Sequence, residues 1–472
     1  MLWVAFQRFG TMGLSFVSNI ILARILTPDD FGCIGLLAIF IALSNTFIDG
    51  GFGAALIQEE NPTHKDTSTI FFWNICLSFA LYAAIYFSAP LIASFYEKPI
   101  LSKLLQVQAL ILITNALSVV PRSILRKRLQ FNHLAIIDLS ASIVGVSTGI
   151  ILAYNEWGVW SLVAYQLTTT LCQVIGLWYI CQWHPSLEFN LQSFKSLFKF
   201  GSYLLVSDLI NSFCDNIQGL VIGKQFSSTT MGYYSQARKL EEVPTTSLTY
   251  VISQVVFPVF SKIKENKESL QTVHKQCIHA AAYINIPLMV LLIIIAQPII
   301  FILLTEKWVA SIPFFQILCL SGAVNSLQSI NYHLYVAKGH SKSMFKWNLF
   351  KRSIGVTLIL LGAMIGIEGL LWGMVIGFWI TYIVNAYLAG KTTGYTLSQQ
   401  IHDLIPVIGS SLMSGGLAYA ISLISSHQNF TTMTMQIIIY TATYIFLSKL
   451  FKLKGFNTYL NLLHRVWGIK RV

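Results

Sequence analysis

The sequence predicts an all-α membrane protein that crosses the bilayer about fourteen times, with two six-helix lobes followed by two additional helices. Of its 472 residues, 55% are hydrophobic and 11% are charged, whereas a soluble domain carries about 25% charged residues. The mean hydropathy is +0.64. Apolar stretches recur along the whole chain, and each has roughly the 20 residues that a helix needs to cross the hydrocarbon core. We therefore expect most of the polypeptide to lie in lipid.

The predicted spans follow one another with short connections. They lie near residues 3–26, 32–57, 69–94, 104–125, 134–154, 157–181, 198–223, 239–262, 276–304, 312–336, 345–366, 368–389, 403–424 and 433–453. No connection is long enough to fold by itself. The longest one on the inner side, residues 262–275, is expected to form a short amphipathic helix on the membrane surface.

The end of the first span carries a pattern that returns 200 residues later. Residues 21–32 run from an apolar helix end through a basic residue to a polar turn and a glycine, and residues 222–232 repeat this order. Thr27 is a good N-cap, and the following proline suits the first position of a new helix. The turn therefore predicts that one helix ends and another begins within a few residues.

This repeat predicts two similar halves. Six spans fall in residues 1–190, six in 191–395, and two more in 396–472, which also holds a basic tail. A second echo supports the division, because Glu156-Trp157-Gly158 opens the sixth span and Glu368-Gly369 opens the twelfth. An even number of spans in each half predicts halves related by an axis along the membrane normal.

The distribution of basic residues predicts the topology. With the N-terminus inside, 23 of the 31 lysines and arginines lie in the inner connections and the tail. The positive-inside rule then places both termini in the cytoplasm. The net charge of +12 therefore reflects topology, and we expect no nucleic-acid partner. The seven cysteines are scattered without a Cys-x-x-Cys pair, so we expect neither a metal site nor a disulfide framework.

Polar side chains recur at helical spacing on three otherwise apolar spans. They are Arg8, Thr11, Ser15 and Asn19 on the first span; Asp208, Asn211, Ser212 and Asp215 on the seventh; and Ser321, Asn325, Gln328 and Tyr332 on the tenth. Such stripes face either a partner helix or a water-filled cavity, because a charge in lipid is costly. Since the first and seventh spans open the two halves, we expect a polar cleft that binds substrate between the halves.

Several single residues allow two interpretations. Arg24 is included among the cavity candidates, although it points about 140° away from Asn19 on the helix and can snorkel to headgroups. Asp49 precedes a run of small residues and either titrates or pairs with a base. Asp138 is expected to form a salt bridge near the inner surface, and His333 is expected to be a packing residue.

The sequence contains no nucleotide-binding loop and no zinc-protease motif. It has no Walker loop and no His-Glu-x-x-His. We therefore expect no catalytic residue, no cofactor and no enzymatic activity. A transporter without a nucleotide site takes its energy from a proton or sodium gradient, or from the gradient of its substrate. Asp208, Asp215 and Asp49 are the candidates for ion coupling.

Five stretches resemble one known family. They are Ile21–Gly32, Phe47–Gln58, Val120–Phe131, Gly158–Gln166 and Phe257–Lys264. Together they are similar to Wzx-type flippases, the polysaccharide transporters of the multidrug/oligosaccharidyl-lipid/polysaccharide (MOP) exporter superfamily, and in particular to its WzxC/TuaB-like branch. The resemblance extends to about residue 390.

The resemblance implies two lobes that form a V around a central cavity open alternately to each side. It also implies a substrate, an oligosaccharide on undecaprenyl diphosphate, that crosses the bacterial inner membrane for exopolysaccharide, capsule or O-antigen assembly. Membrane lipids and other polysaccharide assembly proteins are the expected partners. Two alternatives stay open: an ion-coupled multidrug or toxin antiporter of the same superfamily, and a membrane glycosyltransferase or polymerase.

Overall fold

A computed structural model describes residues 2–59, 63–188, 190–424, 430–456 and 458. Nearly all of the described chain is α-helical. The helices are α1 (Leu2–Ile25), α2 (Pro28–Asp49), α3 (Phe52–Gln58), α4 (His64–Phe95), α5 (Ile100–Gln108), α6 (Leu110–Lys127), α7 (Phe131–Tyr154), α8 (Val159–Cys181), α9 (Leu191–Gln225), α10 (Ser228–Ile263), α11 (Lys267–Ile294), α12 (Ala296–Leu304), the 3₁₀ helix η1 (Glu306–Ser311), α13 (Ile312–Ala337), α14 (Ser341–Ile365), α15 (Ile367–Thr393), α16 (Leu397–Ile424) and α17 (Phe430–Leu450).

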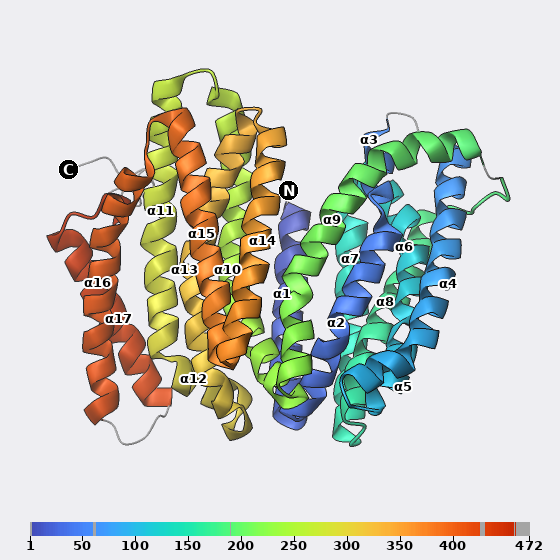
Figure 1. Ribbon diagram of the computed structural model, residues 1–472, viewed down its shortest axis with the longest axis horizontal. Coiled ribbons are helices and arrows are strands. Elements are labelled where there is room, and N and C mark those ends of the chain that lie inside the picture. The colour runs from blue at the N-terminus through green and yellow to red at the C-terminus, as the bar shows by residue number, and fades with distance from the viewer. Residues whose placement is uncertain (1, 60–62, 189, 425–429, 457, 459–472) are drawn as a thin grey trace. The chain divides into compact units, whose positions relative to one another are not determined.

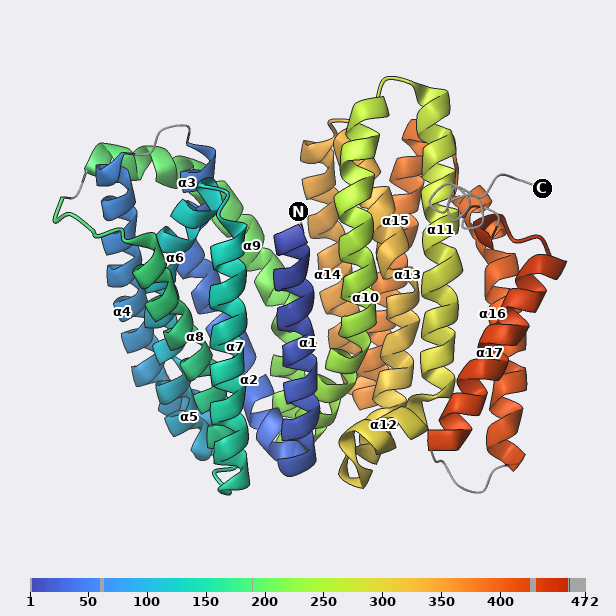
Figure 2. The ribbon, with the colours of Figure 1, turned by 180° about the vertical axis from the view of Figure 1, so that it is seen from behind.

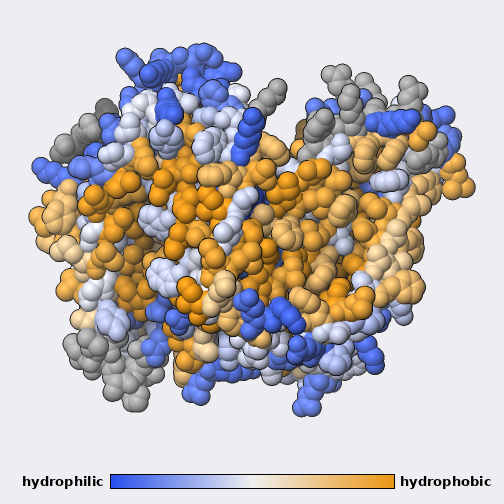
Figure 3. Space-filling view, viewed as in Figure 1, coloured by the Kyte–Doolittle hydropathy of each residue, from blue (hydrophilic) through white to orange (hydrophobic). Residues whose placement is uncertain are grey.

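The helices make a multi-pass membrane protein. In the described part of the chain, 11 helical segments are long and apolar enough to cross a bilayer. On the face shown in Figure 3, hydrophobic side chains cover the middle of the helices and hydrophilic ones gather at their ends. The predicted all-α membrane fold is confirmed, while the number of about fourteen spans stays a prediction.

The chain divides into two compact units, Met1–Ser235 and Gln236–Val472. The first unit contains α1 to α9 and the start of α10. In it α1 packs against α7, which in turn packs against α8 (Figure 2), and α9 packs against α2 (Figure 1). The predicted functional boundaries at residues 190 and 395 stay predictions.

The turn before α2 forms as the sequence predicts. Thr27 caps the helix, its side chain accepting a hydrogen bond from the Asp30 backbone N–H. The Asp30 carboxylate accepts in return from the Thr27 backbone N–H at 2.9 Å, and Pro28 occupies the first position of the helix. Two unpaired backbone donors are satisfied in this way, and a carboxylate lies where the helix dipole is positive.

The first turns of α2 and α10 pack against each other, and this contact explains why the repeated turn carries a glycine in both copies. A methyl group at Gly32 would overlap the Ser228 carbonyl, and one at Gly232 would overlap the Pro28 carbonyl. The contact is reciprocal, since each glycine meets the residue that begins the other helix. Both positions must therefore be glycine for the backbones to approach this closely.

An ion pair holds the same contact together. Lys98, between α4 and α5, donates to both oxygens of Asp29 at 2.5 Å and to Ser228 Oγ at 2.8 Å. Burial is the largest single influence on Lys98 and lowers its pKa. The hydrogen bonds and charges of Asp29 and Cys33 together outweigh burial, so the pKa of Lys98 is raised above its ordinary value. Lys98 thus ties the starts of α2 and α10 to the chain segment after α4.

The second predicted span, 32–57, is wrong as a single helix. It breaks at Gly50 and Gly51, which have φ of +51° and +69°, and α3 begins after them. The break lets α9 cross closely, because a methyl group at Gly51 would lie 2.9 Å from the Gly201 carbonyl oxygen. Two consecutive residues in the left-handed region favour glycine, and this signal was present in the sequence.

Prolines inside two helices leave carbonyls that aromatic side chains satisfy. Pro121 in α6 cannot donate to the Leu117 carbonyl, which instead accepts from Trp178 Nε1 at 3.1 Å. Pro287 in α11 leaves the carbonyl four residues before it without its helical donor, and Tyr444 Oη of α17 donates to it at 3.1 Å. In lipid such carbonyls have no water to bind, so these hydrogen bonds stabilise the bent helices.

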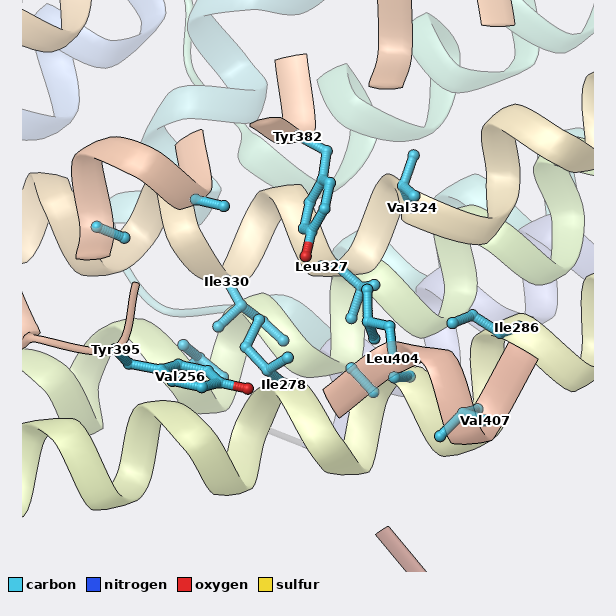
Figure 4. Packing of buried hydrophobic residues seen from close by; sticks show 14 of the residues in the cluster. Val256, Ile278, Ile286, Val324, Leu327, Ile330, Tyr382, Tyr395, Leu404 and Val407 are labelled. Atoms are coloured by element: carbon cyan, nitrogen blue, oxygen red, sulfur yellow. The ribbon is translucent and has the colours of Figure 1, made fainter. Parts of the chain in front are cut away.

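The second unit has its hydrophobic core around α11, α13 and α16. Figure 4 shows Leu327 and Ile330 of α13 together with Ile278 of α11 and Leu404 of α16. The hairpin of α16 and α17 packs against α11. The two helices that follow the predicted twelve therefore belong to this core.

Two predicted helix starts are wrong. The eighth span begins at Ser228 rather than at residue 239, which places Arg238 and Lys239 inside α10. The predicted surface helix 262–275 does not exist as a separate element, because α10 continues to Ile263 and α11 begins at Lys267. In both places a helix extends through charged residues that the predicted spans leave outside.

Candidate functional site

The polar stripe of α1 changes from exposed to buried along the helix. Arg8 is exposed, Thr11 and Ser15 are partly exposed, and Asn19 is buried. Thr11 Oγ1 donates to the Gln7 carbonyl at 2.8 Å, so its hydroxyl is satisfied within the helix. Arg8 is therefore the charged group of this stripe that a ligand can reach.

The stripe of α9 lies on the exposed side of that helix. Asp208 and Asp215 are exposed, and Asn211 and Ser212 are partly exposed. The helix continues without a break through all four residues, so their spacing keeps them on one face. The first unit thus presents two carboxylates to its surroundings, as the spacing predicts, while the predicted cleft and the roles of both stripes stay predictions.

A group of charged residues lies near these stripes in the first unit. Asp138 of α7 accepts from both nitrogens of Arg122, at 2.8 and 3.1 Å, and from Gln7 of α1 at 2.5 Å. The predicted salt bridge at Asp138 is confirmed. The Asp49 carboxylate lies within electrostatic range of Arg126 and Asp208.

These charged residues bring together helices that lie far apart along the chain. They join α1, α6 and α7 through Asp138, and α2, α6 and α9 through Asp49. Arg126 lies within electrostatic range of Asp49 but no ion pair joins these two described residues, so both interpretations of Asp49 stay predictions. No sequence motif connects these positions, because their proximity depends on packing.

Hydrogen bonds connect the third stripe, on α13, to a buried lysine on α14. Gln328 Nε2 donates to Asn325 Oδ1 at 2.9 Å, and Asn385 Nδ2 of α15 donates to the Gln328 carbonyl at 3.3 Å. Lys351 Nζ of α14 donates to Asn385 Oδ1 at 2.5 Å. Tyr332 is partly exposed on the same helix. Lys351 falls in the predicted span 345–366 and was not predicted as part of the site; the structure places its buried ammonium beside this stripe.

Arg24 and its counterpart Lys224 lie at helix ends. Arg24 is exposed in the last turn of α1. Lys224 donates to the Phe95 carbonyl at 3.0 Å and lies over the Phe95 ring. Lys224 therefore connects α9 to the end of α4, in agreement with a structural role for that residue.

Two further buried polar groups in the second unit were not predicted from the sequence. His274 of α11 is completely buried, and its ring nitrogens lie 2.9 Å from Asn331 Oδ1 and 3.3 Å from Thr393 Oγ1. Glu241 of α10 is also buried and accepts from Thr245 Oγ1 at 2.6 Å. His274 falls in the predicted connection 262–275, which the structure places inside α11, whereas Glu241 falls inside a predicted span without being predicted as a site residue. His333 packs edge-on against Phe257 and Tyr332, so it makes the expected packing contacts.

The described residues contain no group of three or more His, Cys, Asp or Glu side chains that could hold a metal ion. What the side chains do offer is hydrogen-bonding groups and charges spread along helices.

A family model for "Polysaccharide biosynthesis protein" matches residues 21–313, which is more than half of the chain. The chain belongs to this polysaccharide biosynthesis family. Its resemblance to polysaccharide transporters, expected from five short stretches, is thereby confirmed.

Relatives from two bacteria align with most of this polysaccharide biosynthesis protein. Lipopolysaccharide biosynthesis protein WzxC of Escherichia coli (strain K12) is 26% identical over 389 residues, covering 82% of this chain and 78% of WzxC. Teichuronic acid biosynthesis protein TuaB of Bacillus subtilis (strain 168) is 26% identical over 390 residues, covering 80% of this chain and 79% of TuaB.

Solved structures confirm the fold of this family member. The inward closed conformation of the lipid II flippase MurJ superposes with a TM-score of 0.75 at 18% identity, covering 96% of this chain and 99% of MurJ. An inward-facing multidrug resistance MATE family transporter of the MOP superfamily gives a TM-score of 0.62 at 17% identity, covering 82% of this chain and 94% of that protein. This chain therefore has the fold that MurJ and this MATE transporter share.

Proposed function

We propose that this protein flips an oligosaccharide linked to undecaprenyl diphosphate from the inner to the outer leaflet of the bacterial inner membrane. The unit it moves serves exopolysaccharide, capsule or O-antigen assembly. One combination of findings carries the proposal: a chain of the polysaccharide biosynthesis family has the fold of a protein that is a lipid II flippase. Among its relatives, the Rhizobium meliloti protein ExoT is named a succinoglycan biosynthesis transport protein.

The polar stripes have distinct roles in this mechanism. Their hydroxyl and amide groups bind the sugars, Arg8 binds the diphosphate, and the prenyl tail stays in the surrounding lipid. Alternating access then exposes the substrate first to one side and then to the other. Membrane lipids and other polysaccharide assembly proteins are the partners that such a process requires, and both termini lie in the cytoplasm.

The transport step takes its energy from a proton or sodium gradient. Exposed carboxylates at Asp208 and Asp215 support this part of the proposal, because a carboxylate that alternates between water and protein can bind and release a cation. Asp208→Asn combined with Asp215→Asn is expected to impair export while the protein still inserts into the membrane. Normal export by this double variant would contradict the coupling role of the two residues.

Deletion in the native host tests the function. We expect lipid-linked repeat units to accumulate on the cytoplasmic leaflet, where externally added glycosidase cannot reach them. Export should return when the gene is supplied again. Unaltered glycan together with lost drug resistance would instead indicate the multidrug antiporter, which the MATE-like fold alone supports. Sugar transfer by the purified protein would indicate the glycosyltransferase or polymerase.

A further inference from the structure

A buried carboxylate lies in the interior of α10. Glu241 is 7% exposed, and at about 1.5 Å per residue it lies roughly 20 Å along the helix from Ser228. The helix is one of the segments apolar enough to cross the membrane. Burying a carboxylate at such a depth costs several kcal/mol unless something compensates its charge. The surroundings of Glu241 must therefore explain how its charge is tolerated.

The charged residues nearby form no ion pair with Glu241 in the described part of the chain, although Arg238 attracts its charge. On its own helix, Arg238 Nε donates to Glu242 at 2.7 Å, and Lys239 is also present. From the neighbouring helices, α11 presents Met289, and α13 presents the thiol of Cys319. Within the described part of the chain, Glu241 forms no ion pair, and its hydrogen bond comes from Thr245 Oγ1.

A second buried oxygen, on the neighbouring helix α11, lacks a donor. Asn285 of α11 is 1% exposed, and its Nδ2 donates to the Gly322 and Ala323 carbonyls at 2.7 and 2.9 Å. Its Oδ1 is buried and has no hydrogen-bond partner. Buried acceptors without a donor are rare, and a bound ion or water is a common reason for them.

Gly322 of α13 makes room for these groups. A methyl group built on Gly322 would overlap Glu241 Oε1 and would lie 2.8 Å from Met289 Sδ and 2.9 Å from Thr245 Oγ1. The Gly322 carbonyl is the one that accepts from Asn285. Side chains of α10 and α11 thus meet over one glycine of α13, and the oxygens they bring are carboxylate, hydroxyl and amide.

We propose that Glu241, Thr245 and Asn285 form a binding site for one monovalent cation, either a proton or Na⁺. A proton binds to the Glu241 carboxylate, which then becomes a donor for a nearby acceptor. Na⁺ is a hard cation that prefers the oxygen ligands found here. Either ion removes the uncompensated charge, so its release is favoured only in a conformation that admits water to the site.

The site supplies a second position at which a cation can be coupled to the proposed export. This coupling role rests on the proposed function, whereas cation binding itself does not. Asp208 and Asp215 are exposed, whereas Glu241 is enclosed by three helices. Occupancy of an enclosed site changes the energy of the conformation around it, because the charge cannot be solvated there. Binding of the cation is measurable without any transport assay.

The first experiment measures sodium binding to the purified full-length protein in detergent. We expect NaCl to raise the melting temperature saturably above the value in choline chloride at equal ionic strength. Glu241→Gln should abolish this sodium-dependent shift. The matched control is Glu242→Gln, which makes the same change one residue away and should keep the shift. Gly322→Ala, which intrudes on the carboxylate without changing a charge, should weaken it and replaces Glu241→Gln if that variant does not fold.

The second experiment distinguishes a proton from sodium. If sodium gives no shift, infrared difference spectra between low and high pH should contain a carboxylic acid carbonyl band that Glu241→Gln removes, Gly322→Ala displaces and Glu242→Gln retains. Absence of both the sodium shift and the Glu241 band overturns the proposal. Export by the deletion strain carrying each variant is scored separately, so cation binding without export would refute the proposed function and leave this site intact.

Discussion

Replacing Gly32 by alanine tests the reciprocal contact between the first turns of α2 and α10. The added methyl group would overlap the Ser228 carbonyl, and Gly232→Ala would do the same at the Pro28 carbonyl. Overpacking costs about 1–3 kcal/mol. We expect the upper half of that range, because the obstacle is backbone and cannot rotate away. Alanine returns about 1 kcal/mol through its better helix propensity, so each variant should lose about 1–2 kcal/mol of stability in total.

The assay is the melting temperature of the purified protein, followed by tryptophan fluorescence in one detergent. Gly13→Ala is the matched control, since nothing lies within 4 Å of a methyl group at that position of α1. The control should melt at the same or a higher temperature, and both contact variants should melt lower. Combining Gly32→Ala with Gly232→Ala should cost less than the sum, because the first methyl group already separates the helices. Equal melting temperatures for Gly32→Ala and the control would refute the reasoning.

Three other substitutions test the polar groups inside the helices. Asp138→Ala should destabilise the protein by about 3–5 kcal/mol, because it leaves the partly buried Arg122 without its carboxylate. Glu188→Gln, which removes the exposed ion pair between Glu188 and Lys65, should cost at most about 1 kcal/mol. Similar losses of the two variants in urea unfolding would contradict this. Lys351→Met should leave the melting temperature unchanged or raise it, since it removes a buried ammonium whose partner is an amide. A clear decrease in the melting temperature would show that the charge of Lys351 is compensated in the folded protein. Tyr444→Phe should cost about 1–3 kcal/mol by leaving a buried carbonyl without a donor, and an unchanged melting temperature would argue against the role of this hydroxyl beside Pro287.

Local signals in the sequence were sufficient for the all-α fold and for several helix ends. Thr27, Pro28 and Asp30 determine the start of α2 through their own side chains and backbone, so the pattern alone predicts it. The break at Gly50 was readable in the same way but was overlooked within an apolar stretch. The start of α10 was missed because Lys239 and its neighbours resemble a helix end, although packing of the surrounding helices keeps them inside one.

The candidate site was predictable only in part. Helical spacing placed Asp208 and Asp215 on one face of α9, because that spacing is a property of the helix itself. The partners of Asp138, Lys351 and Glu241 come from other helices, and nothing in the spacing along one helix reveals which helix will be the neighbour. The repeat at residues 21–32 and 222–232 predicted two similar halves, but the reciprocal glycine contact emerged only from the structure.

Translocation by the purified protein in liposomes tests the central proposal most directly. Undecaprenyl diphosphate carrying a fluorescently labelled oligosaccharide is placed in both leaflets, and a membrane-impermeant reductant is added outside. If the protein flips this lipid, the reductant should quench the label of both leaflets, and Arg8→Ala should slow the loss from the inner one. Label that stays protected in the inner leaflet, as in vesicles without protein, would contradict the proposed function.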